Sequence, residues 1–156
     1  MTRGRCWLVK SEAEVYSIDD LARDTCTAWT GVRNYEARNL MRDQMADGNL
    51  VLYYHSNASP PGVAGLARVR GAPYPDPTQF DPSDRYFDPR ASAADPRWWL
   101  VDIEFVETFP RLVTLQELRA EPRLRDMVLL NRMRLSVQPV TNEELAVVRH
   151  LAGVGA

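Results

Sequence analysis

The alternation of hydrophobic and polar positions along the chain predicts four strands. Residues 6–10 form a short, largely apolar run that is typical of a first strand. Residues 50–55 and 62–70 form two more, joined by a turn rich in serine, asparagine and proline. The run at 50–55 is apolar on both faces, so we expect it to lie centrally in its sheet. Residues 98–107 alternate large apolar with acidic side chains, which indicates a half-exposed strand.

Helical spacing and a capping signal predict two helices in the first third of the chain. Ser17 caps a short helix over 18–23, whose first turn carries two aspartates where the helix dipole favours negative charge. A longer helix runs from about 33 to 45. Its apolar side is formed by Ala37, Leu40, Met41 and Met45. Arg33 and Asn34 lie at its entrance near the edge of that side, where polar groups need either a capping network or a ligand.

Two further helices are predicted near the C-terminus. Thr114 caps a helix that extends to about residue 120. Thr141 and Glu144, three positions apart, form a capping box for a helix that ends at about residue 152. Short strands interleaved with helices, without a regular βαβ rhythm, predict an α+β fold. We expect a small, mostly antiparallel β-barrel surrounded by short helices.

A proline-rich segment separates the last two predicted strands. The whole chain of 156 residues is expected to form a single domain, 1–156. Residues 71–97 carry six of the eleven prolines and four Asp-Pro pairs. An irregular segment of that length inside a compact domain is usually functional or disordered. We predict an ordered flap over 71–97, pinned to the body by its aromatic side chains Tyr74, Phe80, Tyr86 and Phe87.

Composition and charge narrow the classes of function. Hydrophobic residues make up 45% and charged residues 26%, which excludes a disordered chain. The apolar stretches are too short to span a membrane, and the start resembles no signal peptide, so we expect a cytoplasmic protein. The net charge of −2 excludes a protein that tracks long duplexes through many phosphates. Any function on nucleic acid must therefore come from a local site.

The sequence offers weak support for catalysis. The two histidines, His55 and His150, lie on different predicted elements, so we predict no metal site. Cys26 and His55 are conceivable as a thiol–imidazole pair, but their spacing carries almost no specificity, and a small buried cysteine and a hydrogen-bonded histidine explain them better. Neither a glycine-rich phosphate loop nor a nucleophile elbow is present, and we predict no cofactor. A binding module is favoured over an enzyme.

Aromatic and amide-bearing residues occur in compact groups. Trp7 and the Lys10-Ser11 pair lie on the first predicted strand, and Trp29 comes just before the run GVRNY at 31–35. The run YYHSN at 53–57 ends the central strand, and Trp98-Trp99 begins the strand after the flap. Flat side chains can sandwich a flat ligand, while Asn, Ser or Lys groups read its edge. Each tryptophan alone is explained by core packing, and Tyr35 and Arg38 by a solvated helix face. Their joint occurrence favours a ligand site.

Five runs of the sequence carry a resemblance to a known family. They are WLVKSE at 7–12, WTGVRNYEARN at 29–39, YHSN at 54–57, YPDPTQFD at 74–81 and RLSVQPV at 134–140. The chain resembles the EVE domain family over nearly its whole length, from Cys6 to about Leu151. The resemblance implies a PUA-like barrel related to the YTH and ASCH domains. It also implies a pocket for a modified base, such as a methylated or hydroxymethylated cytosine or a modified RNA nucleotide.

The resemblance also implies roles for individual residues. Lys10-Ser11 is similar to the family's pair at the pocket rim, and Trp29 to its aromatic wall. Residues 33–35 resemble its recognition turn at the helix entry, and 54–56 the end of its central strand. Ala13 departs from the family, which usually has proline there, and Glu36 stands where glutamine is commoner. The candidate ligand-binding residues are Lys10, Ser11, Trp29, Arg33, Asn34, Tyr35, Arg38, Tyr54, His55, Ser56 and Trp98.

Residues and resemblance together predict a non-enzymatic module that recognises a modified nucleobase in an aromatic-walled pocket. The expected partner is DNA or RNA, with the nucleotide single-stranded or flipped, because extruding a base from a duplex costs a few kcal/mol. Two alternatives stay open. One is a hydrolase or transferase that acts on a small nucleotide-like ligand, and the other is a sensor for such a ligand.

Overall fold

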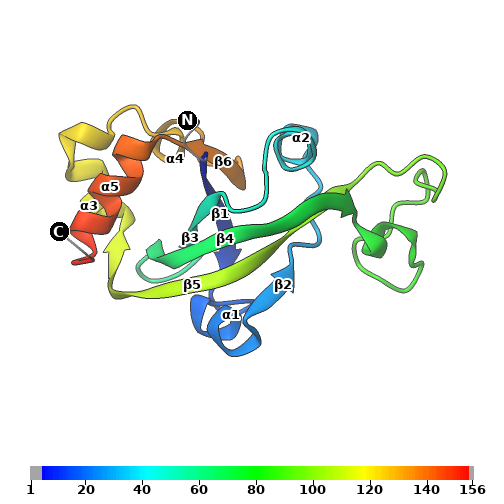
Figure 1. The fold of residues 1–156 in the computed structure, drawn as a ribbon, viewed down its shortest axis with the longest axis horizontal. Coiled ribbons are helices and arrows are strands. Elements are labelled where there is room, and N and C mark those ends of the chain that lie inside the picture. The colour runs from blue at the N-terminus through cyan, green and yellow to red at the C-terminus, as the bar shows by residue number, and fades with distance from the viewer. Residues whose placement is uncertain (1–4, 155–156) are drawn as a thin grey trace.

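The computed structural model describes residues 5–154 and contains a six-stranded sheet (Figure 1). The strands are β1 (Cys6–Glu12), β2 (Cys26–Ala28), β3 (Leu50–Ser56), β4 (Gly62–Pro75), β5 (Trp99–Thr114) and β6 (Val137–Val140). Their order is β2-β5-β4-β3-β1-β6, in which β1 and β3 are parallel and all other neighbours antiparallel. The predicted α+β class and mostly antiparallel sheet are confirmed. Because β2 and β6 are the two ends of this order, the sheet is open, and barrel describes it loosely.

Short helices and 3-10 turns surround the sheet. They are α1 (Ile18–Asp24), α2 (Tyr35–Asp43), η1 (Pro77–Phe80), α3 (Leu115–Ala120), η2 (Pro122–Leu124), α4 (Val128–Asn131) and α5 (Asn142–Leu151). The predicted caps are confirmed, because Ser17, Thr114 and Thr141 each form a capping box. Helices α3, α4 and α5 gather at one end of the sheet, away from α1 and α2 (Figure 1). Over residues 5–154, none of the helices is long and apolar enough to cross a membrane.

The central strands are covered on both faces by hydrophobic clusters. Trp7 on β1 and Tyr53 on β3 belong to one cluster, which includes residues of α1 and α2. Leu8 and Tyr54, one position further along each strand, belong to the other cluster, which includes residues of α3 and α5. Successive side chains of a strand point to opposite faces, so β3 is apolar throughout because both faces pack. The predicted central position of this strand is confirmed.

The observed elements differ from the predicted ones in length. Strands β4 and β5 run to Pro75 and Thr114, well beyond the predicted ends at 70 and 107. Their pairing contains three register shifts, which interrupt the alternation on which the prediction depends. Helix α2 begins two residues later than predicted because Asn34 is its N-cap. Strands β2 and β6, of three and four residues, are too short to show a period.

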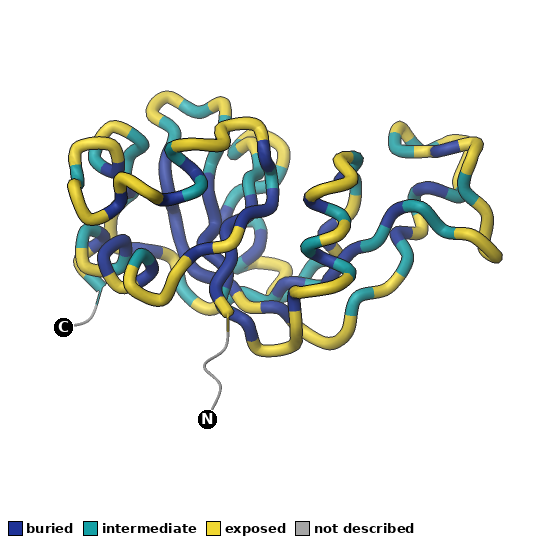
Figure 2. Tube along the Cα trace, turned by 90° about the horizontal axis from the view of Figure 1, so that it is seen from above, coloured by how far each residue is buried: buried dark blue, intermediate teal, exposed yellow. Residues whose placement is uncertain are grey.

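The flap is organised by polar side chains buried at its base. The β4–β5 ladder ends with Pro75 opposite Trp99, after which residues 76–98 protrude from one end of the molecule (Figures 1 and 2). The side-chain Nε2 of the fully buried Gln79 donates to the backbone carbonyls of Asp76 and Trp98 at 2.8 and 2.7 Å. Its carbonyl accepts from the Arg97 and Trp98 amides, both at 2.9 Å. One glutamine therefore joins the two sides of the flap base.

Candidate functional site

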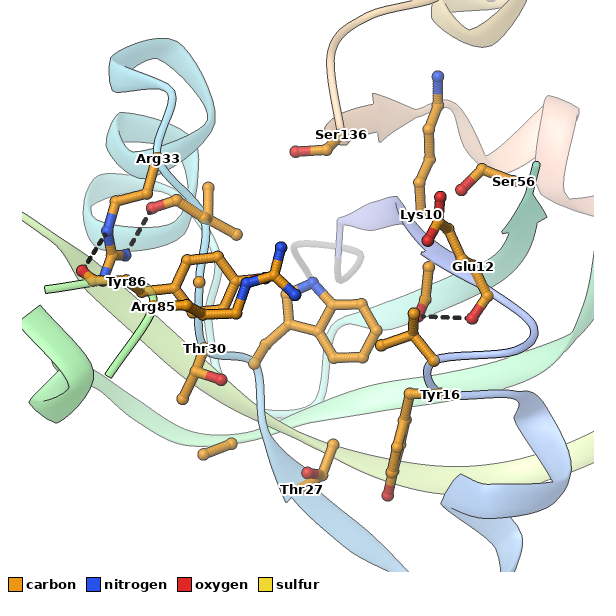
Figure 3. A pocket seen from close by; sticks show the side chains of 16 residues that line it. Lys10, Glu12, Tyr16, Thr27, Thr30, Arg33, Ser56, Arg85, Tyr86 and Ser136 are labelled. Atoms are coloured by element: carbon orange, nitrogen blue, oxygen red, sulfur yellow. Dashed lines mark hydrogen bonds between the residues drawn. The ribbon is translucent and has the colours of Figure 1, made fainter. Parts of the chain in front are cut away.

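A pocket of about 580 Å³ opens at the edge of the sheet where the parallel strands β1 and β3 end (Figure 3). Glu12 at the end of β1 pairs with Ser56 at the end of β3, so the two ends lie side by side. The wall also includes the end of β2, the segment 29–33 before α2, and the flap. The lining residues are Lys10, Ser11, Glu12, Val15, Tyr16, Thr27, Ala28, Trp29, Thr30, Gly31, Val32, Arg33, Ser56, Arg85, Tyr86 and Ser136.

Trp29 lines this pocket. It is 9% exposed, and its ring meets the Tyr53 ring edge-on, with centroids 5.6 Å apart and planes 82° apart. The Tyr53 hydroxyl donates to the Tyr16 carbonyl at 2.6 Å, and burial raises the pKa of Tyr53. A tyrosine held by its own hydrogen bond therefore fixes the indole from behind. Trp29 belongs to the core and also lines the pocket.

Lys10 lines the pocket, but its charge is engaged elsewhere. The Nζ donates to the Met133 carbonyl and lies 5.7 Å from the centroid of the Tyr54 ring. Burial lowers the pKa of Lys10. The ammonium thus ties β1 to the segment before β6 through a backbone carbonyl rather than contacting the expected ligand.

Arg33 also lines the pocket, and all five of its N–H donors have protein partners. Nε donates to the Tyr86 carbonyl at 3.1 Å, and one terminal nitrogen donates to the same oxygen at 2.7 Å and to Thr78 Oγ1 at 3.0 Å. The other terminal nitrogen donates to the Val32 carbonyl at 3.0 Å and to Asp76 Oδ2 at 3.1 Å. The side chain therefore holds the flap against the segment 29–33, so a network rather than a ligand satisfies it.

Six candidate residues lie outside the pocket lining. Three of them, Asn34, Tyr54 and His55, form contacts within the protein that explain their positions. Asn34 caps α2 by accepting from the Ala37 amide at 2.9 Å. The buried Tyr54 packs in the cluster on the face of α3 and α5. His55 Nε2 accepts from the Ile18 amide at 3.1 Å, and burial lowers the pKa of His55, so the imidazole is held neutral. Because that bond occupies Nε2, the imagined pair of His55 with Cys26 has no free imidazole base.

The other three candidates, Tyr35, Arg38 and Trp98, stack together beside the pocket. Trp98 is 4% exposed, and its indole donates to Asp88 Oδ2 at 2.8 Å. The Tyr35 ring stacks on the Trp98 ring with centroids 4.7 Å apart, and the Arg38 guanidinium carbon lies 4.7 Å from the centroid of Tyr35. These side chains support the flap from outside. Of the sequence-based candidates, the pocket gathers Lys10, Ser11, Trp29, Arg33 and Ser56.

Sequence reasoning missed the contribution of the flap to the pocket wall. Tyr86 lies against Gly31, where an added Cβ would fall 2.6 Å from the tyrosine ring. Gly31 also has a φ of +86°, a conformation that favours glycine. The flap can pack closely here only because this position has no side chain. The sequence signal was the glycine directly after the Trp-Thr pair, but its partner is 55 residues further along.

The titratable groups of the pocket are mostly engaged. The Asn57 amide donates to Glu12 Oε1, and the Tyr16 hydroxyl donates to Asp24 Oδ2 at 2.7 Å. Burial, followed by that bond, raises the pKa of Tyr16. Arg85 from the flap is exposed and has neither a hydrogen bond nor an ion pair with any residue in 5–154. In the same part of the chain, no three His, Cys, Asp or Glu side chains gather in a way that could hold a metal ion.

Comparison with known proteins places the chain in a family. The model of the EVE domain matches residues 5–151. The chain belongs to the EVE domain family. Human thymocyte nuclear protein 1 is 40% identical to this EVE domain over 93% of the chain and 72% of the human protein. The zebrafish protein of the same name is 42% identical over 93% of the chain and 71% of its own length.

Solved structures share the architecture of this EVE domain. A hypothetical protein from Leishmania major is 45% identical, with a TM-score of 0.93 over 97% of this chain and 96% of that one. The human THYN1 protein, in complex with DNA containing 5-methylcytosine, is 38% identical, with a TM-score of 0.91 over 98% of this chain and 100% of that one. The fold predicted from the resemblance is therefore the fold of known family members.

Proposed function

We propose that this EVE domain is a module that binds a modified cytosine of DNA, with the base of a single-stranded or flipped nucleotide in the pocket around Trp29. The observation that carries the proposal is the likeness to the human THYN1 protein, whose solved complex contains DNA with 5-methylcytosine. The likeness extends over 98% of this chain, which includes every segment that contributes to the pocket. The whole chain, 1–156, acts as one domain in this proposal.

The chemistry of the pocket supports a cytosine. A volume of about 580 Å³ lies within the usual range for small-ligand sites and accommodates a nucleotide. The indole of Trp29 offers a stacking surface of the kind on which single bases bind. The Glu12 carboxylate can accept from the exocyclic amine of cytosine, since acidic side chains pair with that donor. Stacking and an acceptor for the amine are the two requirements for holding this base.

The enzymatic alternative has no specific support. Two of the groups able to transfer a proton within the pocket are engaged, Lys10 with the Met133 carbonyl and Tyr16 with Asp24, and Glu12 accepts one bond, from Asn57. Residues 5–154 contribute neither cysteine nor histidine to the lining. A catalytic nucleophile or base needs a partner that activates it, and these contacts do not supply one. Binding without chemistry is therefore the function we propose.

A panel of labelled oligonucleotides tests the proposal by fluorescence anisotropy. The probes share one sequence and carry either cytosine or 5-methylcytosine, as single strands, duplexes and the equivalent RNA. We expect the methylated DNA single strand to bind tightest and the methylated duplex more weakly, because flipping a base from a duplex costs a few kcal/mol. Equal affinity for methylated and unmethylated probes of the same form would contradict the proposal.

A further inference from the structure

A continuous stack of aromatic and guanidinium groups runs from α2 through the flap to the pocket. Its members, in order, are Arg38, Tyr35, Trp98, Arg33, Tyr86 and Arg85. Successive groups lie 4.7, 4.7, 5.3, 5.4 and 5.0 Å apart, measured from guanidinium carbon to ring centroid, or between centroids for the two rings that stack. Each cation on a ring face is attracted by the ring's quadrupole. The stack therefore fixes the geometry of its last member.

Arg33 and Arg38 form hydrogen bonds within the protein, whereas Arg85, the last member of the stack, forms none with residues 5–154. Arg33 uses all five donors within the protein. Arg38 donates to Asn39 Oδ1 from two nitrogens, at 3.1 and 2.7 Å, and to the Arg97 carbonyl at 2.8 Å. Arg85 is exposed and donates to no residue in the part of the chain that the structure describes. Among the three arginines of the stack, the one at the pocket end is therefore the one without a hydrogen bond to residues 5–154.

The position of Arg85 follows from contacts of its neighbour Tyr86. The Tyr86 ring lies on Gly31, its carbonyl accepts two bonds from Arg33, and its amide donates to Asp84 Oδ1 at 2.8 Å. Figure 3 shows the guanidinium of Arg85 extending past the Tyr86 ring into the pocket, which Trp29 also lines. The Arg85 guanidinium therefore lies in the wall of a pocket that Trp29 also lines.

We propose that Arg85 binds a phosphate group next to the nucleotide whose base occupies the pocket. This inference rests on the proposed function and specifies the ligand as a nucleotide within a strand rather than a free base. A planar guanidinium suits phosphate because two parallel N–H donors match two oxygens. All five donors of Arg33 are bound within the protein and Lys10 donates to the Met133 carbonyl, whereas Arg85 donates to no residue in 5–154.

A double-mutant cycle between protein and ligand tests the contact. Arg85→Gln is compared with the wild type on a single strand containing 5-methylcytosine and on the same strand with neutral methylphosphonate linkages on both sides of that nucleotide. We expect Arg85→Gln to lower affinity for the normal strand about ten- to a hundred-fold, the range for hydrogen bonds to charged groups. It should also reduce the slope of log affinity against log salt by about 0.7, the value for one phosphate contact on a single strand.

The neutral linkages should then weaken the wild type strongly and Arg85→Gln much less, because the variant has already lost the contact. Arg125→Gln is the matched control: its side chain is 83% exposed, it lies outside the pocket, and it should change neither affinity nor slope. Equal losses for wild type and Arg85→Gln on the neutral strand would overturn the inference, as would unchanged affinity of Arg85→Gln for the normal strand. A wild type that binds neither strand would instead overturn the proposed function itself.

Discussion

Trp29 contributes to the core and to the pocket with different parts of one side chain. Its edge contact with Tyr53 and its low exposure, 9%, place most of the indole among buried residues. The sequence pointed to Trp29 through the grouping of aromatic residues and the resemblance. Core packing was the alternative explanation for each tryptophan, but the sequence could not identify the contact with Tyr53, which lies 24 positions away on the central strand. Truncation to alanine would therefore remove stability and binding together.

Replacement by leucine separates the two contributions. Trp29→Leu keeps an apolar side chain in the core but removes the stacking surface. We expect affinity for the methylated strand to fall about 5- to 150-fold, equivalent to about 1–3 kcal/mol for one stacked base. Trp7→Leu is the control, since Trp7 is fully buried and lies outside the Trp29 pocket. Both variants should lower Tm, but only the first should weaken binding by the folded protein in anisotropy titrations.

Lys10 is expected to behave as a structural residue. Lys10→Met keeps the aliphatic stem and removes the bond to the Met133 carbonyl. A hydrogen bond from a charged group contributes about 1.5 kcal/mol or more, so Tm should fall by about 3–6 °C for a domain of this size. Affinity for the methylated strand should stay within about two-fold. A tenfold loss of affinity with unchanged Tm would show instead that the ammonium contacts the ligand.

At the scale of elements, local signals were readable from the sequence and distant partners were not. The three capping boxes depend on residues three positions apart; the sequence predicted all three N-caps and, for Thr141 with Glu144, the capping box itself. The buried Gln79 and Asp88 that organise the flap bond to residues 10 to 19 positions away. Register shifts between β4 and β5 likewise depend on the partner strand. No periodicity within one segment could have revealed these contacts.

The close packing of the flap on Gly31 can be tested by replacing Gly31 and, as a control, Gly48 with alanine. Gly31 and Gly48 both have a φ of +86°, but an added Cβ meets Tyr86 at Gly31 and nothing within 4 Å at Gly48. Alanine at either position should lower stability by about 1–2 kcal/mol through backbone strain. Gly31→Ala should additionally displace Tyr86 and speed amide exchange over residues 81–88. Hydrogen exchange measured by mass spectrometry that is equally fast there in both variants would argue against this packing.

The bond between Trp98 and Asp88 should make flap stability depend on pH. The indole N–H, followed by the Arg90 side chain and amide, holds the pKa of the Asp88 carboxyl well below its usual range. A carboxyl with a depressed pKa in the folded state adds stability above its unfolded pKa of about 3.9 and loses it as the pH falls further. Asp88→Asn should therefore lower Tm by about 3–6 °C at pH 7. The difference should shrink at pH 3; a constant difference would mean that the charge does not matter.

At the scale of the whole molecule, the sequence predicted the fold class and the family but not that the sheet is open rather than a closed barrel. Alternation and capping indicated short strands among helices, and the resemblance supplied the architecture. The segments that line the pocket are separated by up to 126 positions, from Lys10 to Ser136, and meet because β1 and β3 are parallel and the flap folds back on residues 29–33. The position of Tyr86 against Gly31 could not be assigned without that arrangement.

In the proposed binding mode the base lies against Trp29, and photochemical cross-linking tests this contact most directly. A single strand with 5-iodocytosine at the target position is irradiated in complex with the protein, and tryptic peptides are mapped by mass spectrometry. We expect cross-links in peptide 24–33, which contains Trp29, or in peptide 86–90, which begins with Tyr86. An excess of unlabelled methylated strand should abolish them. Cross-links confined to peptides without a pocket residue, such as 98–111, would contradict the account.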